Sequence, residues 1–184
     1  GSGGSDGTVF GIGGGEQALI WNYESTSMLF GTADTTAITI DSSQNVGIGV
    51  STLDTPYGIT PRLQIEGTNA STSSISAFRN SNDANPPYLL LGKSRGTAVN
   101  ADTAISDNDV LGKIGFVGAD GTDRNNSGAE IFARVNGTPG SNDLPSELVF
   151  ATTADGGTTS TERMYISSAG LVGIGSATPS GGLT

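Results

Sequence analysis

The chain has 184 residues with a formal charge of −10, and it contains 29 glycines but no histidine or cysteine. Nucleic acids and anionic membranes attract basic proteins, so eight Lys and Arg against eighteen Asp and Glu exclude both as partners. Without histidine or cysteine, zinc sites and disulfides are excluded, and we expect no cofactor. No apolar run approaches the ~18 residues of a membrane-spanning helix, so direct membrane insertion is not expected.

The composition indicates strands and turns. Only 34% of the residues are hydrophobic, below the roughly 45–50% of a typical soluble domain. Ser, Thr, Asn and Asp replace them, and these residues favour turns and strand edges over helices. We expect an all-β chain without substantial helix, whose apolar side chains are too few for a thick core of its own. Such a chain usually completes its burial at a subunit interface.

The first third of the chain predicts one small unit and a connector. Residues 1–15 are rich in Gly and Ser and are interpreted as a linker or a weakly ordered strand. Residues 16–53 predict a small four-strand β-meander shaft unit, because short apolar runs alternate there with polar turns. Prolines in 54–61 disfavour both helix and pairing and indicate a connector.

A larger β unit is predicted over 62–178, as a fibre tip or fibre unit, and 179–184 is interpreted as a tail. The best alternation lies in 130–135, where Ile131 and Val135 face one way. Loops rich in turn residues separate the apolar runs. Ahead of the closing strands, this unit has predicted strands at 74–79, 87–92, 110–118, 129–136 and 146–152.

One phrase occurs twice, at 38–50 and 164–176. Each copy consists of an apolar strand, a polar turn and a Val-Gly-Ile-Gly strand, and the copies are 126 residues apart (172 − 46, aligned on their valines). A phrase that closes two successive units is typical of an array of repeats. Because strand side chains alternate in direction, Gly47 and Gly49 are expected to clear one face for close approach of another backbone.

Motifs for catalysis or metal binding are weak. Residues 92–96 read Gly-Lys-Ser-Arg-Gly, the G-x-S-x-G pattern of hydrolases, but no Ser-His-Asp relay can form without histidine, so a turn is favoured. Asp107–Asp109 and Asp120–Asp123 offer oxygen ligands without the spacing of a calcium loop. Solvated loop carboxylates are the favoured interpretation, a bound divalent ion is the alternative, and the expected metal ligands are none.

Aromatic side chains are better candidates for binding. Trp21, the only tryptophan, alternates with Tyr23, so the two rings share one face of a strand. If that face is exposed, the rings form a platform for a sugar. If it is buried, they fill the core of the small unit, which is the favoured of the two alternatives.

Several linked motifs in the larger unit resemble a module of bacteriophage tail fibres and of trimeric adhesive fibres made by bacteria. The resemblance covers residues 62–178 and, as a shorter variant, 16–52. It implies an extracellular homotrimer of intertwined β-strands, on a virion or on a bacterial cell surface, that contacts another cell. Many relatives continue into a self-cleaving intramolecular chaperone, so the resemblance implies that this chain is a fragment or a processed product. The motifs are Ser76–Asn80, Leu89–Gly96, Asp109–Phe116, Gly118–Asp123, Leu148–Thr153, Thr161–Met164 and the closing Val-Gly-Ile-Gly phrase.

The sequence thus predicts an intertwined homotrimeric fibre of short antiparallel meanders or sandwich-like β units. Its expected role is non-catalytic adhesion or receptor binding for host or prey recognition, with a cell-surface glycan as the ligand. The alternatives are a purely structural shaft spacer and a glycan-cleaving tailspike-type hydrolase. The candidate ligand-binding residues are Trp21, Tyr23, Asn85, Tyr88, Asp120, Asp123 and Arg124.

Overall fold

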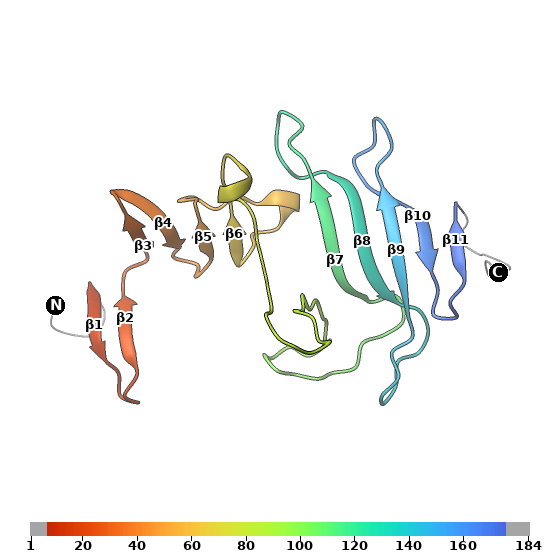
Figure 1. Ribbon diagram of the computed structural model, residues 1–184, viewed down its shortest axis with the longest axis horizontal. Helices are drawn as coiled ribbons and strands as arrows, with labels where there is room; N and C mark the ends of the chain where they lie inside the picture. Colours follow the sequence, from red (N-terminus) through yellow and green to blue (C-terminus); the bar gives the residue numbers. More distant parts are fainter. Residues whose placement is uncertain (1–6, 176–184) are drawn as a thin grey trace. The chain divides into compact units, whose positions relative to one another are not determined.

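The computed structural model describes residues 7–175. Over this range the chain forms eleven strands in three sheets and two single-turn 3-10 helices (Figure 1). The prediction of an all-β chain is therefore confirmed. The predicted tail at 179–184 and the first six residues of the predicted linker lie outside the described residues.

The chain divides into two compact units, and each is described here by itself. Unit 1 comprises Gly1–Thr55 and Ile59–Phe78, and unit 2 comprises Pro56–Gly58 and Arg79–Thr184. Residues 56–58, within the predicted connector, therefore belong to unit 2. The division of the assembled protein into domains stays a prediction.

Unit 1 contains a two-stranded hairpin and a four-stranded sheet. In the four-stranded sheet the last strand pairs parallel to its neighbour, and the other pairs are antiparallel. The strands are β1 (Thr8–Ile12) and β2 (Ala18–Asn22) in the hairpin, and β3 (Met28–Thr32), β4 (Thr35–Ile40), β5 (Val46–Ile48) and β6 (Leu63–Ile65) in the sheet.

The predicted four-strand meander is wrong in its pairing, because β2 pairs with β1 and not with β3. Residues 13–17 make a tight turn between β1 and β2, in which the N–H of Gly13 donates to the carbonyl of Gln17 at 2.7 Å. Glu16 adopts a left-handed φ of 63° there. The glycines at 13–15, which indicated a linker, therefore lie in a hairpin turn. Of the two interpretations of residues 1–15, the strand describes Thr8–Ile12.

Unit 2 contains one antiparallel sheet whose strands follow one another in chain order. The predictions at 110–118, 129–136 and 146–152 are confirmed within two residues at each end. The strands are β7 (Val110–Val117), β8 (Ser127–Val135), β9 (Ser146–Thr152), β10 (Thr161–Ile166) and β11 (Val172–Ile174).

The predicted strands at 74–79 and 87–92 are wrong. Figure 1 draws no arrow between the 3-10 helix η2 (Ala70–Thr72) and β7, and no strand is assigned there. Both segments have the apolar residues of strands, but a strand also requires a neighbour for its backbone N–H and C=O groups. Neither segment finds one within this single chain.

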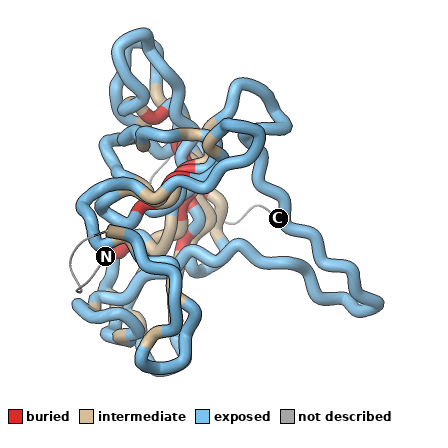
Figure 2. Tube along the Cα trace, turned by 90° about the vertical axis from the view of Figure 1, so that its left-hand side faces the viewer, coloured by how far each residue is buried: buried red, intermediate tan, exposed pale blue. Residues whose placement is uncertain are grey.

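The core is thin, as predicted. Among the described residues the buried hydrophobic side chains are Phe132, Val135, Val149 and Ala151. Figure 2 shows buried positions only in short stretches, with intermediate positions beside them and exposed positions along most of the trace. Three of them cluster on one face of the unit 2 sheet, where Tyr165 packs against them. In contrast, 27 large hydrophobic residues in the described range are exposed.

The repeated phrase forms the same structure twice. In both copies the strand before the polar turn pairs antiparallel with the Val-Gly-Ile strand after it, and an earlier strand pairs on its other side. The matching rows are Phe30–Ile38–Ile48 and Leu29–Thr39–Gly47 in β3–β4–β5, and Phe150–Met164–Ile174 and Val149–Tyr165–Gly173 in β9–β10–β11.

From the sequence, the second glycine of the phrase is expected to clear one face of its strand, but in each copy it lies after the strand and ends it. Gly49 lies just after β5, with a left-handed φ of 73°, and Gly175 follows β11 with a φ of 65°. Both glycines therefore end their strands in a conformation that other residues rarely adopt. A Cβ at Gly49 would also lie 2.4 Å from the carbonyl oxygen of Glu66.

Candidate functional site

The register of the unit 2 sheet separates two faces. Antiparallel partners lie on the same face, and successive residues alternate between faces. One face, here called the polar face, carries the buried cluster around Phe132 and Val149, with charged residues beside it. The charged residues of the polar face are Lys113, Glu130, Arg134, Glu147 and Glu162.

Glu130 is the centre of the first charged cluster and is only 4% exposed. The hydroxyl of Tyr57 donates to its Oε1 at 2.6 Å. The ammonium of Lys113 and the hydroxyl of Ser160 donate to its Oε2 at 3.0 and 2.8 Å. Burial favours a raised pKa for Glu130, but these three donors outweigh it and lower the pKa to about 2.

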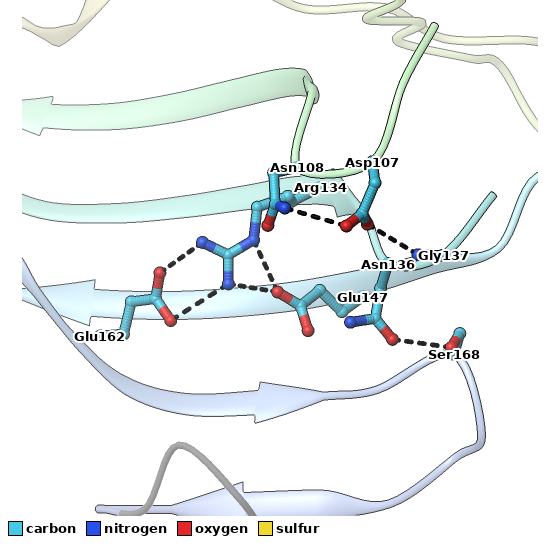
Figure 3. A network of polar contacts seen from close by, with 8 residues as sticks. All are labelled: Asp107, Asn108, Arg134, Asn136, Gly137, Glu147, Glu162 and Ser168. Atoms are coloured by element: carbon cyan, nitrogen blue, oxygen red, sulfur yellow. Dashed lines mark hydrogen bonds and ion pairs between the residues drawn. The ribbon is translucent and has the colours of Figure 1, made fainter. Parts of the chain in front are cut away.

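Arg134 is the centre of the second charged cluster (Figure 3). Its Nε donates to Oε1 of Glu147 at 2.6 Å, and its Nη1 donates to Oε1 of Glu162 at 2.8 Å. Burial disfavours the charged guanidinium, but these two carboxylates outweigh it and raise the pKa of Arg134. The cluster thereby joins β8, β9 and β10.

Side chains at the same end of the sheet hold neighbouring loops in place (Figure 3). Asp107 accepts hydrogen bonds from the backbone N–H of Gly137 at 2.8 Å and from the amide of Asn108 at 3.0 Å. Ser168 donates to Oδ1 of Asn136 at 2.7 Å. These contacts connect loops and strands, and both carboxylate oxygens of Asp107 accept hydrogen bonds in them.

The charged side chains of the polar face hold neighbouring strands and the turn at Tyr57 together. A carboxyl with a pKa of about 2 has no proton to donate at neutral pH, so Glu130 does not fit a general acid. Its bond to Tyr57 instead fixes the 3-10 turn η1 (Pro56–Gly58) on unit 2. The N–H of Tyr57 also donates to the carbonyl of Arg124 at 2.9 Å, and the N–H of Gly58 donates to Oδ1 of Asn125 at 3.1 Å.

Sequence reasoning missed this attachment of η1. Tyr57 and Glu130 are 73 residues apart, and no local pattern connects them. Tyr57 also has a left-handed φ of 60°, which a sequence pattern does not predict for a bulky side chain. Its position after Pro56 indicated only a loop edge.

Trp21 and Tyr23 lie together, as predicted, with ring centroids 6.3 Å apart and ring planes at 49°. Trp21 is 53% exposed and Tyr23 is 41% exposed, so neither ring fills a core in this chain. The favoured alternative from the sequence, burial of both rings in the core of the small unit, is therefore wrong for the single chain, and the exposed alternative describes it. Trp21 borders a cavity of about 410 Å³ within unit 1, which is lined by Ile20, Trp21, Asn22, Glu24, Thr26, Met28, Ile40, Asp41, Ser42 and Gln44.

The polar groups around this cavity, here called the Trp21 pocket, are held by local hydrogen bonds. The amide of Asn22 donates to the carbonyl of Thr26 at 3.0 Å. The carboxylate of Asp41 accepts from the backbone N–H groups of Asn45 and Ser43, both at 2.8 Å. These bonds, with those from Asn45 the strongest, lower the pKa of Asp41. The lining therefore includes the ionised Asp41, a second acidic residue in Glu24, and no Lys or Arg.

Asp120, Asp123 and Arg124 lie in the loop between β7 and β8, and the two carboxylates shape that loop. Oδ1 of Asp120 accepts from the N–H groups of Thr122 at 2.8 Å and Asp123 at 3.0 Å. Asp123 accepts from the N–H of Asn125 at 2.9 Å. In residues 7–175 no group of three or more acidic side chains is arranged to hold a metal ion.

Asn85 and Tyr88 precede the G-x-S-x-G segment. The N–H of Asn85 donates to Asp83 at 2.8 Å, its carbonyl accepts from Arg79 at 2.5 Å, and Tyr88 is 70% exposed. The role of the seven candidate residues in binding stays a prediction. Trp21 and Tyr23 belong to unit 1, and the other five belong to separate loops of unit 2.

The G-x-S-x-G segment has no regular secondary structure, bends at Arg95 and is held by Asp109. Lys93 donates to Asp109 at 2.6 Å, and Arg95 donates to both of its oxygens, at 2.7 and 3.0 Å. Arg95 and Lys93 hold the pKa of Asp109 far below its usual range. Both oxygens of Asp109 thus bind Lys93 and Arg95 of this segment, which agrees with the interpretation of the segment as structural.

The fold is that of a bacteriophage tail-fibre domain. It is similar to the carboxy-terminal domain of the bacteriophage T5 L-shaped tail fibre, with a TM-score of 0.56, 12% identity, and 83% of this chain and 66% of that chain covered. The same T5 domain with its intra-molecular chaperone domain gives a TM-score of 0.59, 15% identity, and coverage of 83% and 45%.

The chain therefore spans less than two thirds of the length of either tail-fibre structure. No protein-family model and no curated protein sequence matches it. At identities this low the structural similarity shows a common fold alone, and on that level the predicted resemblance is confirmed. None of the helices in the described range has the length and apolar character needed to cross a membrane.

Proposed function

We propose that the chain is a segment of a tail-fibre-type adhesin that acts without catalysis. It works as a homotrimer, is exposed on a virion or a bacterial cell surface, and attaches to another cell through a glycan. The observation that carries the proposal is the tail-fibre fold in a chain whose described residues include 27 exposed large hydrophobic side chains.

The exposed apolar residues support assembly. A standard protein–protein interface has about 20–30 residues on each side. Within residues 7–175 the exposed large hydrophobic residues reach that number, while the buried hydrophobic side chains are four. A soluble monomer rarely exposes so much apolar surface, so copies of the chain are expected to cover one another. Cyclic trimers are among the closed symmetries that achieve this.

The Trp21 pocket supports glycan binding. Its volume of about 410 Å³ is within the ~300–1,000 Å³ of typical small-ligand sites. An exposed indole offers a flat apolar surface to the C–H face of a sugar ring, and Ser42 and Gln44 line the same pocket as possible hydrogen-bonding groups. Because the lining is acidic and has no Lys or Arg, a neutral sugar suits it better than a sialylated or sulfated one.

Glycan binding is tested by titrating the chain with neutral and with sialylated oligosaccharides and following tryptophan fluorescence. Trp21 is the only tryptophan, so the signal reports on this pocket alone. We expect a saturable change with the neutral sugars, and at least about tenfold weaker binding of Trp21→Ala by calorimetry. Phe78→Ala, a change at an exposed ring that does not line the Trp21 pocket, is the matched control and should bind normally.

The two alternatives predict different results in the same experiment. A purely structural shaft spacer binds no member of the glycan panel. A glycan-cleaving hydrolase releases new reducing ends from the bound glycan over time. Binding without product release is the result that the proposed function requires.

A further inference from the structure

The loop after β8 contains the only Asn-Gly pair of the sequence, Asn136 and Gly137. In such a pair the backbone nitrogen of the glycine can attack the side-chain carbonyl carbon of the asparagine, because no side chain on the glycine obstructs the approach. The two groups belong to neighbouring residues, so the attack is intramolecular and fast once they are aligned. This pair is therefore the place in the sequence where an asparagine is most prone to lose its amide.

The reaction converts asparagine to an acid by way of a cyclic imide. The nitrogen of Gly137 forms a bond to Cγ of Asn136, and the carboxamide nitrogen leaves as ammonia with the proton of the Gly137 N–H. Water then opens the imide. Hydrolysis of the new N–Cγ bond gives aspartate, and hydrolysis of the original peptide bond gives isoaspartate, which has one more carbon in the backbone. One water is consumed and one ammonia is released.

The fold requires glycine at position 137. Gly137 has a φ of 131°, in a region that residues with a side chain rarely adopt. A Cβ at this position would also lie 3.2 Å from Cγ of Pro145. The loop thus keeps a reactive pair that a different residue at position 137 would remove.

Hydrogen bonds hold both groups that must meet in this reaction (Figure 3). The N–H of Gly137 donates to Oδ1 of Asp107 at 2.8 Å, and the hydroxyl of Ser168 donates to Oδ1 of Asn136 at 2.7 Å. Figure 3 shows the carboxamide of Asn136 directed toward Ser168 and the nitrogen of Gly137 connected to Asp107, in a different direction. The backbone of Asn136 is held as well, because its N–H donates to the carbonyl of Pro145 at 2.9 Å.

The two residues that hold the pair come from separate segments. Asp107 precedes β7 and is 30 residues from Gly137, and Ser168 lies between β10 and β11, 32 residues from Asn136. The amide of Asn108 donates to the second oxygen of Asp107 at 3.0 Å and orients that carboxylate. Because only the folded unit 2 brings these groups together, their effect on the pair is a property of the tertiary structure.

We propose that Asn136 and Gly137 form a deamidation site that Asp107 and Ser168 keep unreactive in the folded chain. The attack requires the Gly137 nitrogen to lose the proton that Asp107 binds and the carboxamide to turn toward that nitrogen. Both hydrogen bonds must therefore break before the bond to Cγ forms. Asp107 and Ser168 are positioning residues, since they hold the reacting groups and take no part in the bond changes.

Local opening of the loop starts the reaction, and the product prevents the loop from closing as before. Asp107, Gly137 and Ser168 are exposed, and exposed loops open at a small fraction of the free energy of global unfolding. After deamidation, position 136 carries a negative charge in a loop that is already held by the carboxylate of Asp107. Like charges at close range repel, so the modified loop is less stable than the original.

Peptide mass spectrometry tests the protection in the full chain. The chain is incubated folded in mildly alkaline buffer, and the conversion of Asn136 to aspartate and isoaspartate is followed over time. The same chain unfolded in urea gives the reference rate. We expect conversion to be at least about tenfold slower in the folded chain, because two hydrogen bonds must break. Equal rates would overturn the proposal.

Removing either hydrogen bond should accelerate conversion in the folded chain. Asp107→Ala should raise the rate by at least about fivefold and Ser168→Ala by about two- to fivefold, since a bond to an ionised acceptor is stronger than one between neutral groups. Asp107→Asn keeps an acceptor oxygen and Ser168→Thr keeps a hydroxyl, so both should retain most of the protection. Alanine variants that convert no faster than the wild type contradict the proposed role of the two residues.

Tyr57→Phe is the matched control for a general loss of stability. It weakens unit 2 at Glu130 and leaves the hydrogen bonds of Asp107 and Ser168 in place. Its conversion rate should stay within about twofold of the wild-type rate, because the loop opens locally. An acceleration as large as that of Asp107→Ala would mean that unfolding of the whole unit controls the reaction, and the proposal would then be wrong.

Discussion

The two copies of the repeated phrase form the same three-stranded meander in different surroundings. In β3–β4–β5 the strand that follows is β6, which pairs parallel to β5. In β9–β10–β11 the additional strand is β8, which pairs with β9 on the opposite side. The meander itself is thus the repeated unit, and its neighbours decide which edge and which face are completed.

Burial differs accordingly between equivalent positions. Leu29 and Val149 occupy the same place in the two meanders, yet Leu29 is 60% exposed and Val149 is fully buried. At the other edge, Ile48 beside β6 is 38% exposed and its equivalent Ile174 is 71% exposed. Equal local sequence therefore does not give equal burial, because burial depends on the strand or copy that comes next.

The largest expected effect is the difference in stability between Asp substitutions at the equivalent positions Val149 and Leu29. Val149→Asp places a charge without a partner in the buried cluster and should cost about 3–5 kcal/mol or more of the free energy of unfolding. Leu29→Asp, at the equivalent exposed position, should cost less than about 1 kcal/mol. Urea unfolding followed by circular dichroism measures both. Equal losses would mean that Leu29 is covered as well.

The next largest effect is the loss of stability when Gly49 or Gly175, the last glycine of each phrase, is replaced by alanine. Gly49→Ala combines a left-handed φ with a Cβ 2.4 Å from the carbonyl of Glu66, whereas a Cβ at Gly175 has no neighbour within 4 Å. We expect a loss of about 2–4 kcal/mol for Gly49→Ala and of about 1–2 kcal/mol for Gly175→Ala. The same unfolding experiment decides, and a larger loss at Gly175 would contradict the assigned surroundings.

The first meander has Asp41, a carboxyl with a lowered pKa, in its turn but no counterpart of β8 and its Glu130, so Glu130 adds a pH dependence of stability that is specific to unit 2. The folded pKa of Glu130, about 2, lies below the ordinary value of 4.5. Its contribution is therefore complete above pH 4.5 and is lost as the pH falls toward 2. Glu130→Gln should be less stable at neutral pH and should lose less stability over this window.

Tyr57→Phe examines the same cluster by a milder change. It removes one hydrogen bond to Glu130 and should cost about 1–3 kcal/mol at neutral pH. Unfolding in urea at several pH values measures both variants. An unchanged acid dependence in Glu130→Gln would show that another carboxyl carries it.

The smallest effect concerns the turns of the two meanders. Gln44 and Gly170 are equivalent, with left-handed φ angles of 67° and 78°. Gln44→Gly should be neutral or stabilise by up to about 1 kcal/mol, and Gly170→Gln should destabilise by about 1 kcal/mol. Unfolding midpoints of both variants check the equivalence, and a stabilising Gly170→Gln would refute it.

Local features of the fold were predictable from the sequence. The strands β7, β8 and β9 follow from alternation, and the equivalent strand pairs β4–β5 and β10–β11 follow from the repeated phrase. The proximity of Trp21 and Tyr23 was also predictable, because residues two apart on a strand share a face. The exposure of Trp21 was not, since it depends on which elements surround its hairpin.

By itself, the sequence determined an all-β chain with a thin core, because composition, alternation and turn residues act over a few neighbouring positions. Only the tertiary structure decided that β2 pairs with β1, that β6 joins β5 in parallel, and that Tyr57 reaches Glu130. These contacts connect groups whose partners are not encoded nearby. The segment from Tyr88 to Leu91 shows the same limit, because its apolar run predicts a strand, and no strand is assigned there.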